Sequence, residues 1–173
     1  MSLTSLLEEA LEAWQYTRAG VIEEVENLSV ADLKFRPQAE SRTVAELVVH
    51  LAESGLMMAG ELTRPDGNFR RKSYPQLLKE YAAGLAPATK KPQLVRLLKR
   101  THTEGDRKIR DAGELFMLQS ITRFDGERGT RLAWMNHGIS HEDYHRGQIA
   151  LYARLVGRVP ALTQRILGIS SQG

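Results

Sequence analysis

Three histidines, His137, His141 and His145, recur at every fourth position near the C-terminal end of the chain. Because an α-helix completes a turn in about 3.6 residues, this spacing stacks the three imidazoles on one helical face. A helical wheel adds uncharged residues to that face: Trp134, Gln148, Tyr152, Leu155 and Val156. The other side carries the charged residues Glu142, Asp143, Arg146 and Arg154. The pattern predicts a helix that buries its histidine face and exposes its charges, so the fold must provide partners for buried imidazoles.

Apolar residues elsewhere recur at three- and four-residue steps, which predicts three more long helices. With the histidine helix, the expected ranges are 3–27, about 43–62, 91–112 and 130–156. Capping-box pairs mark two of the helix starts, Ser5 with Glu8 and Thr43 with Glu46. Shorter helices are expected at 73–83 and 161–167.

Two stretches depart from the helical pattern. Residues 113–130 carry apolar side chains without a helical period, followed by a turn at 125–129, and are expected to form an extended connection. The third long helix contains a polar run at 101–106 that includes Gly105, and we expect the helix to fray or bend there. His102 lies in this polar run and is expected at the surface.

Length and composition favour a single globular domain over residues 1–173. The chain has 173 residues, of which 42% are hydrophobic and 26% charged, and such a chain can bury a core. It contains no cysteine, which excludes disulfides, thiolate metal sites and a cysteine nucleophile. The predicted class is all-α, a four-helix bundle with extra short helices between the second and third long helices and at the C-terminus.

Charge and hydropathy limit the classes of function. The net charge of +3 and the pI of about 9.3 are mildly basic. No zinc finger, RNA-binding motif or helix-turn-helix accompanies the basic residues, so nucleic-acid binding is not predicted. No apolar run approaches the roughly 20 residues of a membrane span, and the first ten residues do not resemble a signal peptide. The protein is expected in the cytoplasm, without a membrane partner.

A metal ion is the partner that best accounts for a row of inward histidines. Two imidazoles four residues apart on one helix can both reach a metal through Nε2. The third ligand must come from another helix, and His50, at the edge of the apolar face of the second helix, is the best candidate. Three neutral imidazoles leave coordination positions open for water or substrate. The competing interpretation is a set of core histidines bonded to serine, tyrosine, glutamine and backbone groups, without a metal.

Two stretches of the chain resemble the DinB-like family. One is residues 141–148, His-Glu-Asp-Tyr-His-Arg-Gly-Gln, continuing to Leu-Val-Gly-Arg-Val-Pro at 155–160, and the other is residues 41–51. The resemblance covers the whole chain in the order of its elements, and departs from the family mainly between the second and third helices. It implies a four-helix bundle, often a homodimer, that binds a divalent metal through His50, His141 and His145. His137 is then expected to line the pocket or to support the ligands.

The resemblance also implies chemistry with low-molecular-weight thiols, either thiol transfer to small electrophiles or a thiol-dependent isomerisation. The helical wheel shows no inward carboxylate on the histidine helix, and Glu53 lies off the apolar face of the second helix. The lack of a general base favours a thiol over hydrolysis. Zinc or nickel is the expected metal, although copper and iron also suit three imidazoles. The alternative function is a non-catalytic stress-response or dimeric interaction module with a structural metal.

The remaining residues of the histidine helix have mostly structural interpretations. Gln148 and Tyr152 share the histidine face, where they either orient a water or substrate or pack in the core. Gly147 is expected to permit the close approach of another helix. Arg146 is expected to face outward, in a salt bridge or a subunit contact.

Overall fold

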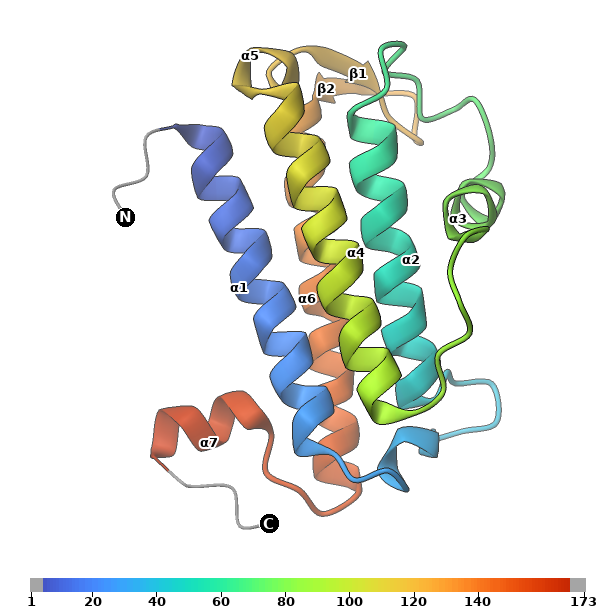
Figure 1. The fold of residues 1–173 in the computed structure, drawn as a ribbon, viewed down its shortest axis with the longest axis vertical. Helices are drawn as coiled ribbons and strands as arrows, with labels where there is room; N and C mark the ends of the chain where they lie inside the picture. Colours follow the sequence, from blue (N-terminus) through green and yellow to red (C-terminus); the bar gives the residue numbers. More distant parts are fainter. Residues whose placement is uncertain (1–4, 169–173) are drawn as a thin grey trace.

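Four long helices form a bundle in the computed structural model, which describes residues 5–168 (Figure 1). They are α1 (Leu6–Asn27), α2 (Val44–Leu62), α4 (Lys91–Ala112) and α6 (Arg131–Leu155). Shorter helices lie between and after them: the 3-10 turn η1 (Asp32–Lys34), α3 (Tyr74–Ala82), α5 (Glu114–Met117) and α7 (Ala161–Leu167). The predicted all-α four-helix bundle with short additional helices is confirmed. Among the helices of residues 5–168, none combines the length and the hydropathy that crossing a bilayer requires.

Side-chain caps set the starts of three long helices. The hydroxyl of Ser5 accepts a hydrogen bond of 3.3 Å from the backbone N–H of Glu8. Thr43 and Glu46 form the complete capping box at the start of α2, and Thr130 caps α6. These bonds satisfy backbone N–H groups that have no partner within the helix. The first helix was predicted to begin at position 3, and positions 3 and 4 lie outside the described residues.

The four helices do not alternate in direction. In Figure 1, α1 and α6 run downward, whereas α2 and α4 run upward. Each of α1 and α2 packs against both α4 and α6, so the parallel helices α2 and α4 are neighbours. Because α2 ends at the upper end of the bundle and α4 begins at the lower end, residues 63–90 cross the length of the bundle on its outside. We call this segment, which contains α3, the crossover.

A buried carboxylate fastens the crossover to α2. Glu61, only 1% exposed, forms an ion pair with Arg71 and accepts a hydrogen bond of 2.7 Å from the hydroxyl of Tyr81. Arg71 also pairs with Glu80 at 3.0 Å. The Tyr81 ring lies against Gly60, where any side chain would collide with it. The crossover is therefore anchored to α2 both before α3 and within it.

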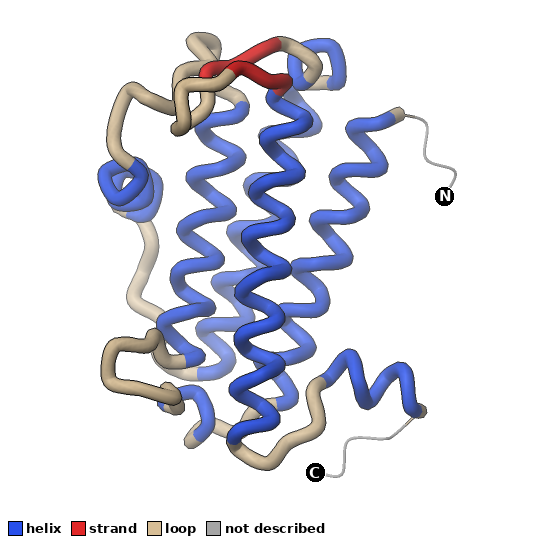
Figure 2. The backbone as a smooth tube through the Cα atoms, turned by 180° about the vertical axis from the view of Figure 1, so that it is seen from behind, coloured by secondary structure: helices blue, strands red, loops and turns tan. Residues whose placement is uncertain are grey.

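A short hairpin occupies the connection before α6 (Figure 2). Strands β1 (Ser120–Thr122) and β2 (Arg128–Thr130) pair antiparallel, and the turn between them contains Gly126 with φ of 90°, a conformation that favours glycine. The extended connection predicted for 113–130 is thus partly wrong, because its first residues form α5. The side chain of Glu114 accepts a hydrogen bond from the backbone of α1 and ties α5 to that helix.

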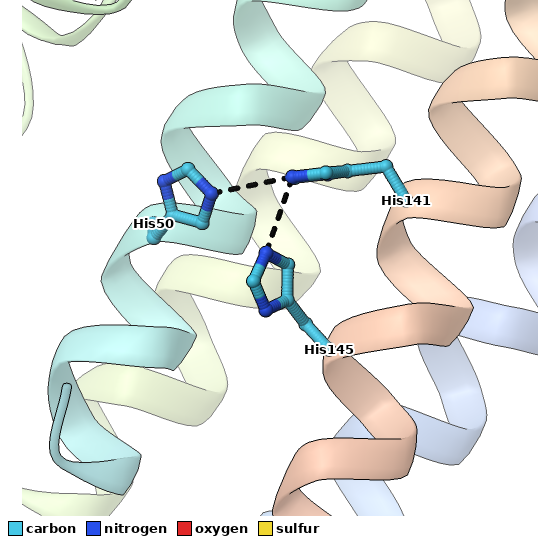
Figure 3. Close-up of side chains that lie close together, drawn as sticks. All are labelled: His50, His141 and His145. Carbon is cyan, nitrogen blue, oxygen red and sulfur yellow. Dashed lines mark hydrogen bonds between the residues drawn. The ribbon is translucent and has the colours of Figure 1, made fainter. Parts of the chain in front are cut away.

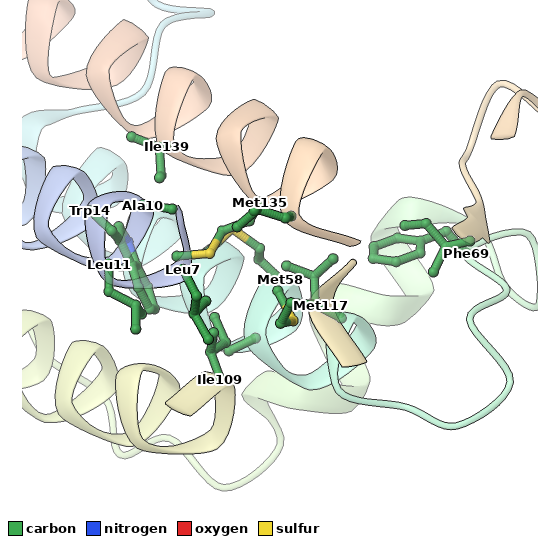
Figure 4. Packing of buried hydrophobic residues seen from close by; sticks show 14 residues of the cluster. Leu7, Ala10, Leu11, Trp14, Met58, Phe69, Ile109, Met117, Met135 and Ile139 are labelled. Carbon is green, nitrogen blue, oxygen red and sulfur yellow. The ribbon is translucent and has the colours of Figure 1, made fainter. Parts of the chain in front are cut away.

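The apolar core forms two clusters along the bundle. The upper cluster is shown in Figure 4 and includes Leu7, Leu11, Trp14, Met58, Phe69, Ile109, Met117, Met135 and Ile139. The lower cluster includes Val21, Val25, Leu47, Leu51, Leu94, Leu98, Ile149 and Tyr152. Between the clusters, every long helix contributes buried polar residues: Arg18, Ser54, Thr101, His102, Glu142 and His145. We call these six residues the polar layer.

The third long helix, α4, continues without interruption through the bend predicted at 101–106. His102 is only 6% exposed, and its ring packs on Trp14 with centroids 4.5 Å apart. Gly105 permits the close approach of two helices, because a Cβ atom there would lie 2.6 Å from Cη2 of Trp14 and 3.1 Å from Cβ of Ala59. The predicted bend and the surface position of His102 are therefore wrong, since Trp14 occupies the space beside this part of α4.

Replacing Gly105 with alanine is expected to destabilise the protein by about 1–3 kcal/mol, because the added methyl group overlaps the buried Trp14 ring. The matched control is Gly147→Ala in α6, where the added methyl group meets open space. That control should stabilise the protein by about 0.5–1 kcal/mol through its higher helix propensity. Urea unfolding followed by circular dichroism measures both changes, and equal effects would contradict the packing role of Gly105.

Candidate metal centre

Three imidazoles from two helices converge in the bundle (Figure 3), and one of them, His145, belongs to the polar layer. His50 projects from α2, and His141 and His145 project from α6 one turn apart. The Nε2 atom of His141 lies 3.3 Å from Nε2 of His50 and 3.1 Å from Nε2 of His145. One ligand nitrogen of each ring lies within 4.8 Å of the other two. The structure thus brings together the three residues that the sequence suggested as ligands.

The spacing of these nitrogens fits a single small cation. In tetrahedral zinc sites the ligand nitrogens lie about 2.0–2.1 Å from the ion, which places two of them about 3.3–3.4 Å apart. The observed separations of 3.3 and 3.1 Å are close to that value. Hydrogen bonds alone do not account for them, because a neutral His141 can donate or accept only one such bond at Nε2. A shared cation satisfies all three nitrogens at once.

Gln148 determines which nitrogen of His145 is free. The Nδ1–H group of His145 donates a hydrogen bond of 2.6 Å to Oε1 of Gln148, so Nε2 keeps its lone pair. The amide of Gln148 in turn donates to the hydroxyl of Tyr144 at 3.4 Å. Histidines that ligate metals ordinarily use their second ring nitrogen in this way. Of the two interpretations for Gln148, its geometry fits the orienting one.

Burial keeps the three imidazoles neutral. It lowers the pKa of His50 to about 3 and the pKa of His141 to about 4, and it lowers the pKa of His145 as well. The positive charge of Arg42, which precedes α2, lowers all three pKa values further. At pH 7 each ring therefore keeps one unprotonated nitrogen that is available to a cation.

The histidines form part of the wall of a cavity of about 470 Å³ between α2 and α6, a volume typical of small-molecule sites. Aromatic side chains of the crossover, the hairpin and α6 also line it: Phe69, Tyr74, Phe124 and Trp134. Backbone hydrogen bonds join the crossover to β1, since Phe69 N–H donates to Thr122 at 3.0 Å and Thr122 N–H donates to Gly67 at 2.9 Å. The crossover and the hairpin therefore hold each other in place, together with the aromatic side chains that they contribute to the wall.

The other two residues predicted near the pocket, His137 and Tyr152, lie in different surroundings. His137 is exposed and lines the cavity, and its ring packs on Trp134 with centroids 4.5 Å apart. Tyr152 is buried in the lower apolar cluster, where its ring meets Phe35 edge-on at 5.6 Å. The surroundings of Tyr152 fit the packing interpretation rather than a place beside the pocket.

Only part of the charged side of α6 faces solvent, where Asp143 and Arg154 are exposed as predicted. Glu142 and Arg146 are 3% and 8% exposed, whereas His137 on the predicted inward face is exposed. Because α6 packs against α1 as well as α2, its buried arc is centred near Glu142 and the histidines lie on one flank. The guanidinium of Arg146 fills the space beside Gly20 of α1, and Gly147 faces open space. The predicted outward positions of Glu142 and Arg146 and the close approach at Gly147 are therefore wrong.

Glu142 is an inward carboxylate that the helical wheel did not detect. Its side chain forms an ion pair with Arg18 of α1 and accepts a hydrogen bond of 2.9 Å from Nε1 of Trp14. Arg18 also donates to the carbonyl of Leu98 at 3.0 Å and to the hydroxyl of Thr101 at 3.2 Å. Each oxygen of Glu142 accepts at least one of these bonds, so proton transfer to this cavity-lining carboxylate would compete with its bonds to Arg18 and Trp14.

Two arginines of the site were not singled out from the sequence. Arg18 follows Trp14 by four residues and precedes Val21 by three, so it interrupts the apolar stripe of α1 at a buried position. This interruption was a usable signal, because a buried charge requires a partner. Arg42 is exposed, and no local pattern distinguishes it from the other arginines of the chain.

Comparison with known proteins agrees with this architecture. A model of the DinB family matches residues 1–171, whereas a search of curated protein sequences gives no match. A DinB-like protein from Bacillus subtilis shares 20% identity over 87% of this chain and 93% of its own, with a TM-score of 0.67. YfiT from Bacillus subtilis, described as a probable metal-dependent hydrolase with an unusual four-helix bundle topology, shares 16% identity over 88% of each chain, also with a TM-score of 0.67. A mycothiol-dependent maleylpyruvate isomerase shares 14% identity over 84% of this chain and 63% of its own, with a TM-score of 0.65.

Removing Arg18 leaves the Glu142 carboxylate buried without its cation. Arg18→Met is therefore expected to lower the free energy of unfolding by about 3–5 kcal/mol. The double variant Arg18→Met/Glu142→Gln removes both charges but keeps an acceptor for Trp14, and should recover most of the loss. Urea titration at pH 7 measures both variants. A double variant no more stable than Arg18→Met alone would contradict the role assigned to the ion pair.

Proposed function

The chain belongs to the DinB family, and on this premise we propose that it is a divalent-metal-dependent enzyme that transfers a low-molecular-weight thiol to small electrophiles. The observation that carries the proposal is the position of three converging imidazole nitrogens in the wall of a cavity. A structural metal site closes around its ion, whereas a catalytic site keeps one position open. Three protein ligands beside a cavity of about 470 Å³ fit the catalytic kind.

The proposed ligands are His50, His141 and His145, and Gln148 holds the ring of His145 in orientation. A divalent ion bound there supplies a Lewis acid that lowers the pKa of a thiol or water beside it. Zinc and nickel are the leading choices, because imidazole nitrogens suit both metals. His137 lines the cavity outside this set and is proposed to contact the substrate.

The cavity favours a thiol over an activated water as the nucleophile. Hydrolysis is assisted by a general base within hydrogen-bond reach of the water. Among the described residues that line the cavity, the one carboxylate is Glu142, whose oxygens are both engaged by Arg18 and Trp14. A thiol has a far lower pKa than water and needs less help from a base. Likeness to a mycothiol-dependent isomerase supports the thiol, and likeness to a probable metal-dependent hydrolase supports the metal.

The proposed reaction forms one carbon–sulfur bond. The thiol sulfur supplies an electron pair to the electrophilic carbon, the leaving group departs with the electrons of the broken bond, and the thiol proton passes to solvent. No atom of the enzyme is oxidised or reduced. The chain's own residues bind and orient the two substrates and shield them from water within the cavity.

The alternative function, a non-catalytic stress-response or interaction module with a structural metal, predicts a closed pocket. The open space beside the histidines favours the enzyme over this alternative. The homodimer and the cytoplasmic location expected from the sequence stay predictions.

Metal content should depend on each proposed ligand. His50→Ala, His141→Ala and His145→Ala are each expected to reduce zinc or nickel from about one ion per chain to about a tenth of that or less. Gln148→Leu keeps all three ligands and is expected to weaken metal affinity about 10–100-fold. Elemental analysis by mass spectrometry, on protein purified without a histidine tag, measures these changes.

His137→Ala is the matched control for metal content, because it removes an imidazole of the same helix outside the converging set. Its metal content should equal that of the wild type. Wild-type protein that neither carries zinc or nickel nor takes up either metal would reject the proposed site.

Metal-loaded protein is expected to conjugate a low-molecular-weight thiol to 1-chloro-2,4-dinitrobenzene, with glutathione, coenzyme A and mycothiol as the thiols tested. The absorbance of the thioether product follows the rate. A chelator should abolish the enzymatic rate, and added zinc or nickel should restore it in wild type but not in His141→Ala. Metal-dependent hydrolysis of activated esters without any thiol, in place of conjugation, would overturn the proposed nucleophile.

A further inference from the structure

The cavity extends along α2 on both sides of the histidines. With a helical rise of about 1.5 Å per residue, His50 lies about 9 Å beyond Val44, the first residue of α2, and Met57 lies about 10 Å beyond His50. Arg42 precedes α2 and lines one end of the cavity, whereas Met57 and the aromatic residues of the crossover and hairpin line the other. The histidines therefore lie between two ends of different chemistry.

The end nearest the hairpin is a cluster of aromatic rings. Phe124 lies edge-on to Phe69 and Tyr74, with ring centroids 5.3 and 5.9 Å away. Trp134 lies 6.1 Å from Phe69 and 6.3 Å from Phe124. The guanidinium of Arg123 lies over the Trp134 ring, but it is paired with an aspartate of the hairpin and does not line the cavity. In the described chain, the cavity wall at this end is therefore mainly aromatic. Its polar groups are the imidazole of His137 beside Trp134 and the hydroxyls of Ser54 and Tyr74, which lie 3.1 Å apart.

Such a surface suits a flat apolar molecule. Aromatic rings give large contact areas and favour other rings in edge-on or offset contact, whereas a strongly polar ligand would find few hydrogen-bonding groups here to replace its water. A pocket of about 150 Å³ is enough for benzene. Because the whole cavity measures about 470 Å³, an aromatic ligand at this end leaves room for a second molecule at the histidines.

Arg42 gives the opposite end a positive charge. Its side chain is exposed, and residues 5–168 place no acidic group within ion-pair distance of it. Glu46 and Glu53 lie close enough to respond to this charge, but neither of them lines the cavity. The charge of Glu142, which does line it, is compensated by Arg18. This end of the cavity therefore attracts an anion, and a guanidinium suits a carboxylate or a phosphate.

We propose that the two ends of the cavity hold the two substrates separately, an inference that rests on the proposed function. The aromatic end binds an electrophile with a flat aromatic body, and Arg42 binds an anionic group of the thiol. The sulfur and the electrophilic carbon meet at the histidines, where the carbon–sulfur bond forms. The leaving group departs with its bonding electrons, and the thiol proton passes to solvent. The substrate class is thus aromatic electrophiles combined with anionic thiols.

An unreactive fluorescent probe tests the aromatic end without turnover. N-phenyl-1-naphthylamine is uncharged and is expected to bind the wild type, and Trp134→Leu and Phe124→Leu should each raise its Kd at least about tenfold. Leucine keeps apolar volume at both positions, and thermal unfolding identifies the variants that remain folded. Tyr16→Leu is the matched control, because it removes an exposed aromatic side chain of α1 outside the cavity. Its Kd for the probe should equal that of the wild type.

S-methylglutathione tests the Arg42 end, because it carries the carboxylates of a common thiol but no free sulfhydryl. Isothermal titration of zinc-loaded protein is expected to show a Kd about tenfold higher for Arg42→Gln than for wild type. Arg36→Gln, at an exposed arginine of the same loop outside the cavity, should leave this Kd unchanged. Arg42→Gln should also leave the Kd of the aromatic probe unchanged.

Two results would overturn the division of the cavity. One is an unchanged affinity for N-phenyl-1-naphthylamine in folded Trp134→Leu and Phe124→Leu, and the other is an unchanged affinity for S-methylglutathione in Arg42→Gln. The proposed function fails separately, when metal-loaded protein conjugates no thiol although both probes bind as described. The binding measurements therefore test the proposed substrate class, and the conjugation assay tests the proposed reaction.

Discussion

The ion pair between Arg18 and Glu142 is the interaction on which the arrangement of the bundle depends. Either charge alone would be strongly destabilising at its buried position, so α1 and α6 pack with these side chains in contact. Because Glu142 follows His141 directly in the chain, the contact also determines how α6 is rotated about its axis. We interpret the polar layer as the feature that sets the register of the four helices and turns two histidines of α6 toward α2.

Signals that depend on near neighbours in the chain predicted most of the fold. Capping residues such as Ser5 and Thr43 marked helix starts, because their bonds reach only three residues ahead. Apolar periodicity predicted the long helices because it also relates residues only three or four positions apart. Local rules placed His137, His141 and His145 on one helix face and His50 near the edge of the apolar face of α2. The resemblance to the DinB-like family was needed to choose His141 and His145 over His137 as ligands beside His50.

Those local signals could not predict contacts between residues that are far apart in the chain. The partner of Glu142, Arg18, is 124 residues away in the chain. A helical wheel drawn for α6 alone therefore assigned Glu142 to the solvent-exposed face. His102 is buried only because Trp14 of another helix covers it. The aromatic end of the cavity arises where the crossover meets the hairpin, through Phe69 and Phe124. Neither phenylalanine belongs to a periodic pattern, because each lies in a loop.

The parallel direction of α2 and α4 has a consequence for how such proteins diverge. It obliges the chain to include the crossover, which lies outside the four-helix core yet supplies Phe69 and Tyr74 to the cavity wall. Glu61 anchors this segment to α2 from outside the polar layer. Changes of sequence or length in the crossover can therefore reshape the binding space while the ion pair and the histidines persist. Substrate choice can therefore change in one segment while the packing of the four-helix core stays the same.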